Sequence, residues 1–175
     1  MDLTIAPSRD FSVSGSVAYL DSKFTDFKTA SNLPGLPGTQ DLTGKPNTFS
    51  PKWSGNVAVD WGTDLGQSGM RLAVNGTMSF ISSQFVGTVN DNNPQSLAAP
   101  YALLGGRISL SGNDDRWTLS VFARNLANKH YRPLTVYQPL GAALGLNNTV
   151  FPGSTANRVS ASEPRMFGAA ATYRF

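Results

Sequence analysis

The sequence predicts an all-β fold, an antiparallel meander of about six long strands, on three observations. Apolar and small polar side chains alternate over segments of ten or so residues, as in strands, where successive side chains point to opposite faces. Gly, Pro, Asn and Asp cluster between these segments, which is typical of turns and loops. The connections are alternately long and short, so we expect turns at one end of the sheet and loops at the other.

The composition narrows the kind of β protein. Of 175 residues, 40% are hydrophobic and only 14% are charged, against roughly 25% charged in a typical soluble domain. No apolar run is long enough to cross a bilayer as a helix. Abundant Gly, Ser, Asn and Thr are typical of transmembrane barrels. The meander is therefore interpreted as a partial segment of a transmembrane β-barrel.

Charge and cysteine content exclude other classes of protein. The net charge is +3, and the Lys and Arg residues are scattered along the chain. A protein that binds nucleic acid usually gathers them in a patch, so we expect no nucleic acid partner. With no cysteine, the chain has neither a disulfide framework nor a thiolate metal site.

The first strands follow residues 2–5, which look like the end of a strand closed by a turn at residues 6–10. Strands are expected at about residues 11–27 and 52–62, each with an apolar row opposite a row of Ser, Ala, Asn or Asp. We expect the apolar rows to face lipid. They are Phe11, Val13, Gly15, Val17 and Tyr19, then Trp53, Gly55, Val57, Val59 and Trp61.

The third and fourth strands are expected at about residues 70–86 and 101–111. Their apolar rows are Leu72, Val74, Gly76, Met78 and Phe80, then Leu104, Gly106, Ile108 and Leu110.

The last two strands are expected at about residues 116–131 and 163–175. Every expected strand reaches the about nine to eleven residues that a tilted strand needs to span the hydrocarbon. The last two apolar rows are Trp117, Leu119, Val121 and Ala123, then Phe167, Ala169, Ala171, Tyr173 and Phe175.

The connections give the sheet an orientation. Residues 6–10, 63–69 and 112–115 form short turns, whereas residues 28–51, 87–100 and 132–162 form long loops. Outer-membrane barrels place short turns in the periplasm and long loops outside the cell. The opposite face of the strands then lines the barrel lumen, and its most polar residues are Asp60, Arg71, Asn75, Arg107 and Arg124.

Four motifs in order resemble TonB-dependent outer-membrane receptors. Residues 121–131 read VFARNLANKHY, which is similar to the NL-x-(D/N)-(K/R)-x-Y motif of the family's penultimate strand. Tyr173 and Phe175 are similar to its aromatic-x-aromatic ending. Residues 50–61 (SPKWSGNVAVDW) and 15–27 (GSVAYLDSKFTDF) resemble two earlier strands of the family.

The resemblance implies TonB-dependent uptake of a solute such as a siderophore, in the outer membrane of a Gram-negative bacterium. It implies a 22-stranded barrel around an amino-terminal plug. Residues 1–175 are interpreted as the C-terminal portion of such a barrel, with the plug and the N-terminal strands absent. The expected partners are outer-membrane lipid, the remaining barrel strands and plug, the barrel-assembly machinery and the transported solute.

Particular residues are candidates for these contacts. Binding residues often lie on loops held by a rigid scaffold, so we expect solute contacts in the last long loop. Tyr173 and Phe175 are expected to be read by the barrel-assembly machinery through strand addition. The candidate loop contacts are Tyr137, Gln138, Asn147, Asn148, Arg158 and Arg165.

No enzyme, cofactor or metal site is expected. His130 is the only histidine, and one imidazole without partners makes neither a metal site nor a nucleophile pair. The alternatives are a small structural barrel or pore formed by self-association of the chain, and a soluble β-sandwich. A closed barrel needs about eight strands, so the chain by itself is not expected to close.

Overall fold

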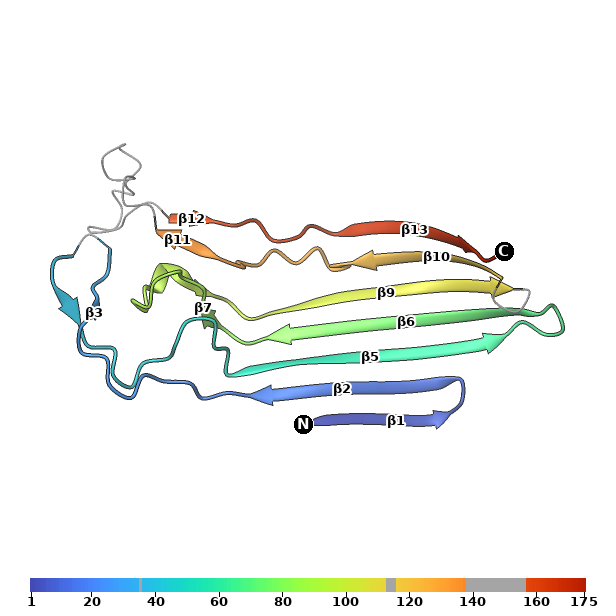
Figure 1. The fold of residues 1–175 in the computed structure, drawn as a ribbon, viewed down its shortest axis with the longest axis horizontal. Coiled ribbons are helices and arrows are strands. Elements are labelled where there is room, and N and C mark those ends of the chain that lie inside the picture. The colour runs from blue at the N-terminus through green and yellow to red at the C-terminus, as the bar shows by residue number, and fades with distance from the viewer. Residues whose placement is uncertain (35, 113–115, 138–156) are drawn as a thin grey trace.

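The computed structural model describes residues 1–34, 36–112, 116–137 and 157–175. Its main feature is one seven-stranded antiparallel meander, in which each strand pairs with the next long strand along the chain (Figure 1). The expected all-β meander is therefore confirmed. The strands are β1 (Asp2–Ser8), β2 (Phe11–Tyr19), β5 (Trp53–Asp64), β6 (Met70–Ile81), β9 (Tyr101–Gly112), β10 (Trp117–Arg124) and β13 (Met166–Tyr173).

The register of the sheet keeps the expected apolar rows on one face. Val13 pairs with Val59, and Leu72 pairs with Leu110, which in turn pairs with Leu119. Because the side-chain period of a strand is two, a slip of one residue between any two strands would bring an apolar row beside a polar one. No such slip occurs from β2 to β13.

Several expected strand ends are wrong. The strands expected at residues 11–27, 70–86 and 116–131 leave the sheet at Tyr19, Ile81 and Arg124. The regular alternation also stops at these points, since residues 20–27, 82–86 and 125–131 do not repeat with period two, and the expected strands had included the first residues of the loops. The expected stub at residues 2–5 is instead a full member of the sheet, since β1 runs to Ser8 and pairs with β2. β10 and β13 have eight residues each, fewer than expected.

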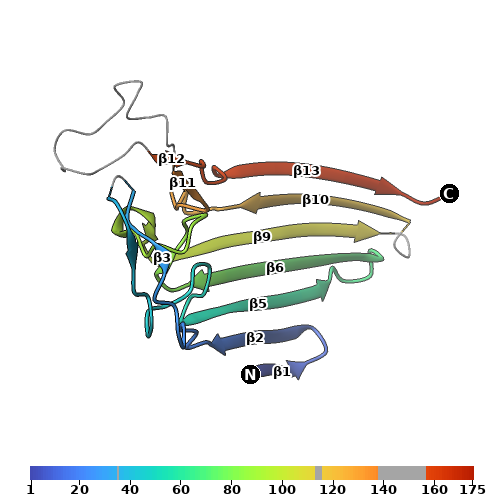
Figure 2. The same cartoon turned by 60° about the vertical axis from the view of Figure 1, so that its left-hand side comes forward.

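The long connections form structure of their own at one end of the sheet (Figures 1 and 2). Among the described residues they contain β3 (Ala30–Ser31), β4 (Thr39–Gln40), β7 (Gln84–Phe85), the 3-10 helix η1 (Pro94–Ser96), β8 (Leu97–Ala98), β11 (Thr135–Tyr137) and β12 (Asn157–Val159). We call the described residues of these long connections, with their short strands and 3-10 helix, the loop cap. All four buried apolar side chains among the described residues belong to it: Ala30, Leu42, Val86 and Ala98.

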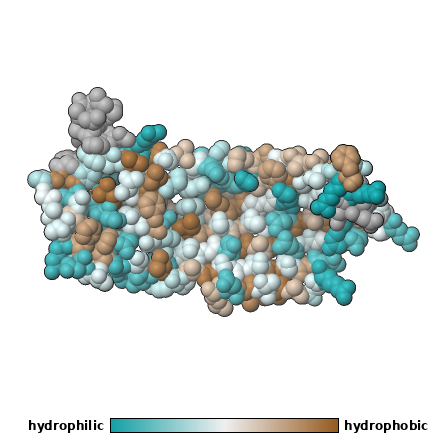
Figure 3. Space-filling view, viewed as in Figure 1, coloured by the Kyte–Doolittle hydropathy of each residue, from teal (hydrophilic) through white to brown (hydrophobic). Residues whose placement is uncertain are grey.

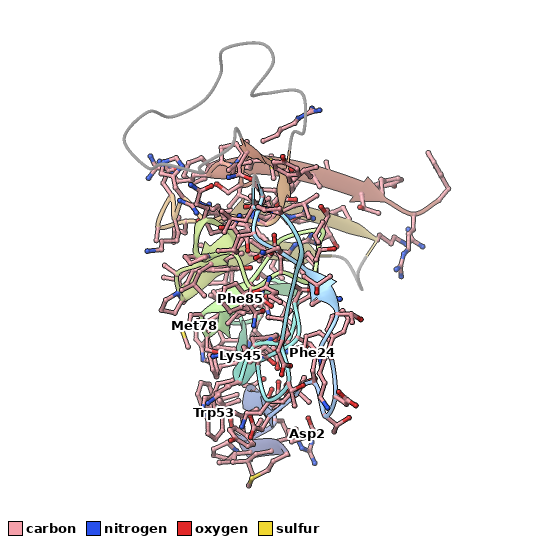
Figure 4. All side chains as sticks on the ribbon, turned by 90° about the vertical axis from the view of Figure 1, so that its left-hand side faces the viewer. Asp2, Phe24, Lys45, Trp53, Met78 and Phe85 are labelled. Atoms are coloured by element: carbon pink, nitrogen blue, oxygen red, sulfur yellow. The ribbon has the colours of Figure 1, made fainter. Side chains whose placement is uncertain are left out.

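The two faces of the sheet differ in their surroundings. Figure 4 looks from the loop end and places Trp53 and Met78 on one side of the sheet, with Asp2 and Phe24 on the other. Figure 3 shows hydrophilic side chains over the face seen in Figure 1, many of them near the short turns. Ile108, Leu119 and Val121 on the apolar face are about half exposed. We call the two sides the apolar face and the polar face.

Aromatic residues stand at both ends of the apolar face. At the loop end the rings of Tyr19 and Trp53 are 4.7 Å apart, and at the turn end Tyr173 and Phe175 meet edge to face at 5.2 Å. Aromatic girdles of this kind lie at the two interfaces of a membrane. No helix within the described residues is long and apolar enough to span a bilayer.

A charge on the apolar face is expected to be far more costly than one on the polar face. Val57 lies midway along β5 on the apolar face, and Ala58 is its neighbour on the polar face. Val57→Arg should lower the free energy of unfolding from lipid vesicles by about 2–4 kcal/mol. Ala58→Arg is the matched control, expected to change it by about 0.5 kcal/mol or less. Equal losses for the two variants would contradict the assignment of the faces.

Candidate functional site

The turn end of the polar face is organised around Arg71. Its guanidinium donates to the Asp10 and Asp64 carboxylates, each at 2.9 Å, and so joins the turns after β1 and β5. A Cβ on Gly62 would lie 2.8 Å from Arg71 Nη2, so glycine leaves the space that the guanidinium fills. Arg71 was expected in the lumen, but its two acidic partners were not foreseen. The sequence could have indicated them, because both aspartates stand in or beside short turns and would meet a basic residue at the same end of the sheet.

Three more of the expected lumen residues, Asp60, Asn75 and Arg107, lie beside Arg71 on the polar face. Asn75 Nδ2 donates to Asp60 Oδ1 at 2.7 Å. Arg107 stacks over the Phe122 ring, with 5.6 Å from Cζ to the ring centroid, an arrangement that stabilises a cation. Asp60, Arg71, Asn75 and Arg107 line one hollow of about 220 Å³. The structure thus brings four of the five expected lumen residues together.

The fifth residue, Arg124, lies at the loop end of the polar face. It lines a separate hollow of about 350 Å³ with Asn56, Tyr131 and Glu163. The Tyr131 ring stacks on Tyr101 with centroids 4.4 Å apart. These two tyrosines were not predicted as site residues, although Tyr131 ends the NLANKHY segment and Tyr101 begins a strand. An arginine, a glutamate and stacked rings could hold a solute through charge, hydrogen bonds and aromatic contact.

The loop cap stands beyond this second hollow and is joined by backbone hydrogen bonds. Thr135 donates its N–H to the Val86 carbonyl at 2.8 Å, and its own carbonyl accepts from Thr88 at 3.2 Å. Gln40 Nε2 donates to the Asp91 carbonyl at 2.8 Å. Three loops far apart in sequence are therefore one unit, which gives candidate ligand contacts a fixed support.

The expected loop contacts have different surroundings. Tyr137 is half-buried in β11 and pairs with Asn157, whereas Arg158 is exposed in β12. The Arg165 guanidinium lies over the Phe167 ring, 5.7 Å from its centroid, and Phe167 belongs to the apolar face. Gln138, Asn147 and Asn148 lie outside the described residues.

The single histidine and the acidic side chains are the groups that could bind a metal ion. His130 is exposed at the loop end. Within the described residues, no three His, Asp or Glu side chains are grouped so that they could hold a metal ion. The polar face offers charged, amide and aromatic groups that could bind a solute.

Asn125 fixes the turn that follows β10. It has a positive φ of 47° and is only 6% exposed. Its Nδ2 donates to the carbonyls of Lys129 at 3.0 Å and Glu163 at 2.8 Å, and its Oδ1 accepts from Lys129 N–H at 2.8 Å. Asparagine tolerates left-handed backbone better than most residues, and its amide both donates and accepts. This side chain therefore sets the entry of the chain into the last strand.

Comparison with protein families identifies one match. The family model described as "TonB dependent receptor-like, beta-barrel" matches residues 2–126, a range that holds β1 to β10 and Asn125. Comparison with curated proteins gave no match.

Loss of the Asn125 side chain should loosen the turn after β10. Asn125→Ala leaves a buried N–H and two carbonyls without partners, so we expect a local loss of about 2–4 kcal/mol, read as hydrogen-exchange protection over residues 125–130 and 163–166. Asn125→Gly relieves the backbone conformation but not the lost hydrogen bonds, and it should also lose most of this protection. Hydrogen-exchange protection of Asn125→Gly equal to that of the wild type would contradict the role of the side-chain hydrogen bonds in holding this turn.

Asp91 should make the loop cap weaker at neutral pH than at acid pH. Burial raises the pKa of Asp91 above its usual value, outweighing the hydrogen bond from Asn93 N–H. A raised pKa in the folded state means that stability is fully present below pH 3.8 and is lost as the pH rises through the raised value. Asp91→Asn keeps the Oδ1 acceptor, so it should increase hydrogen-exchange protection of residues 84–98 at pH 7 but not at pH 3.

Asp41 is the control of opposite sign. Hydrogen bonds from the Thr43 hydroxyl and N–H lower the pKa of this exposed carboxyl. Asp41→Asn should therefore leave the cap unchanged or slightly looser at pH 7. A gain in protection for Asp41→Asn as large as that for Asp91→Asn would contradict the role of burial.

Proposed function

This chain belongs to the TonB-dependent receptor-like β-barrel family, non-enzymatic transporters of the Gram-negative outer membrane, and on that premise we propose that it serves in TonB-dependent uptake of a solute such as a siderophore. The observation that carries the proposal is the sheet itself. Its apolar face is continuous from β1 to β13, its other face is polar, and the family match covers most of its strands.

The solute would first meet the loop cap and then the hollow at the loop end of the polar face. Tyr137 and Arg158 are proposed as contacts in the cap, as are Gln138, Asn147 and Asn148. Arg124 and Glu163 offer both signs of charge beneath it, and Tyr101 and Tyr131 add stacked rings. This arrangement supports a polar, partly aromatic or metal-chelating solute better than a purely apolar one.

The polar wall nearer the turns is proposed to contact the plug. Arg71 already pairs with two carboxylates, so it is proposed to hold the turns together. Asp60, Asn75 and Arg107 line an open hollow and could pair with polar groups of a plug that fills the lumen.

The sheet needs further strands to complete a barrel. β1 and β13 are the two edges of the described sheet, and their unpaired backbone groups would each cost several kcal/mol, roughly, in hydrocarbon. We propose that residues 1–175 are the C-terminal portion of the receptor barrel and that other strands of the receptor pair with these edges. Tyr173 and Phe175 at the edge are proposed to be recognised by the barrel-assembly machinery.

A second candidate function is a small pore formed by several copies of the chain. The open edges favour it, because β1 of one copy could pair with β13 of the next. Such a pore would pass ions and small solutes without TonB, whereas the receptor would need TonB for uptake.

Uptake by cells that express the receptor tests the two functions. Radiolabelled ferric siderophores, cobalamin and maltooligosaccharides are supplied to cells with and without TonB. The receptor function predicts accumulation of one solute only when TonB is present. Tyr137→Ala and Arg158→Ala should weaken its binding about tenfold or more, the loss expected for an anchor contact worth about 1.4 kcal/mol.

The matched control is Lys28→Ala, an exposed basic residue of another loop, which should leave binding unchanged. Uptake of several small solutes regardless of TonB, together with steady conductance of the purified protein in planar bilayers, would contradict the receptor function and support the pore.

A further inference from the structure

The two faces of the sheet do not by themselves fix the register of the last two strands. A slip of one residue would exchange the faces, but a slip of two keeps every apolar side chain on the apolar face. In β13, residues 169–171 are three alanines, so neighbouring registers look alike along much of this strand. A further feature must therefore select the observed register, in which Val121 pairs with Ala169.

The connection between β10 and β13 does not select the register either. β9 ends at Gly112 and β10 begins at Trp117, so a short turn aligns that pair of strands. β10 and β13 lie side by side (Figure 1) but are joined by residues 125–165. Because the entropy of closing a loop changes slowly with its length, such a long connection tolerates a shift of two residues.

One cross-strand pair fits the observed register better than its neighbours. Phe122 of β10 lies directly opposite Gly168, the only glycine of β13. A Cβ at residue 168 would lie 2.8 Å from Phe122 Cε1 and 2.9 Å from Cε2, so the ring fills the space that a side chain would need. Aromatic rings over cross-strand glycines are a known means of fixing register. A slip of two would bring Phe122 opposite Met166 or Ala170, and the ring would lose this space.

The turn after β10 brings the last strand to this pair. Asn125 Nδ2 donates to the Glu163 carbonyl at 2.8 Å, and Asn128 Oδ1 accepts from the Arg165 N–H at 3.2 Å. These hydrogen bonds place the chain before β13 against the end of β10. They use backbone groups of the incoming chain, which nearly every residue offers, so they favour pairing without choosing between registers. The choice is left to the ring and the glycine.

We propose that Phe122 and Gly168 are positioning residues, which select the register of the last strand. They thereby place Tyr173 and Phe175 at the level where the barrel-assembly machinery is proposed to recognise them. In this register Tyr173 pairs with Trp117 at the turn end. A slip of two would move Phe175 along the strand direction by about 7 Å. The recognition step rests on the proposed function, whereas the selection of register does not.

Disulfide formation in the membrane-embedded receptor reports the register, because the chain has no cysteine. Cysteines that replace Ser120 and Ala170, which are directly paired, report the observed register. Cysteines at Ser120 and Thr172, or at Thr118 and Ala170, report the two slips of two residues. In the wild-type background we expect a disulfide between residues 120 and 170 alone, since diagonal neighbours lie about 7–8 Å apart, too far for a disulfide.

Loss of the ring should release the slipped registers. Phe122→Ala should lower the ratio of native to slipped disulfide about fivefold. Leu119→Ala is the matched control, since it shortens a large side chain of β10 whose partner is Ala171, and it should keep the native disulfide alone. Phe122→Gly combined with Gly168→Phe exchanges the ring and the glycine, so it should restore the wild-type ratio. A general loss of stability would instead lower all disulfides together.

The amount of receptor in the outer membrane is measured for the same variants. Phe122→Ala should accumulate less than Leu119→Ala, and the exchange variant should return to the wild-type amount. If Phe122→Ala does not reach the membrane, the exchange variant decides both questions.

Two results would overturn the proposal. The native disulfide alone in Phe122→Ala, or slipped disulfides in the exchange variant, would contradict the selection of register. Equal accumulation of Phe122→Ala and Leu119→Ala would contradict the positioning of Tyr173 and Phe175. Neither measurement depends on solute uptake, so a failure of the transport function would leave both results unchanged.

Discussion

The structure depends on one constraint, which is that every backbone N–H and C=O inside hydrocarbon needs a hydrogen-bond partner. Strands satisfy this requirement by pairing with one another. Because successive side chains of a strand point to opposite faces, the pairing also fixes which side chains face lipid. From β2 to β13 the pairings keep the apolar row of each strand beside the apolar row of the next. Hydrogen bonding and side-chain pattern therefore agree in this register, and a shift of one residue in one pair of strands would place Asp60 or Arg107 in the lipid.

The same register concentrates polar chemistry on the other face. Arg71 joins two turns at one end, while Arg124 and Glu163 share a hollow at the other. The loop cap closes over this second end through hydrogen bonds between distant loops. A sheet with one polar and one apolar face suits a wall between a solute pathway and a membrane.

Periodicity predicted the two faces because alternation is local, and each strand of the sheet carries it in its own sequence. The strand ends were predicted less well, since β2 stops at Tyr19, where the alternation also stops, although the aromatic residues at 24 and 27 had suggested a longer strand. The loop cap also depends on contacts such as Thr135 with Val86, which join residues far apart in sequence. The surroundings of Arg165 could not be predicted either. Its guanidinium lies over the Phe167 ring, and the sequence does not show in which direction a side chain points.

The orientation of β6 is the most direct test of the two-faced sheet. The chain has no cysteine, so single cysteines at residues 72–80 can carry a spin label in the membrane-embedded receptor. Collision of the label with dissolved oxygen, which concentrates in lipid, should alternate along β6. It should be high at Leu72, Val74, Gly76, Met78 and Phe80 and low at the residues between them. Collision rates without this period of two would contradict the account.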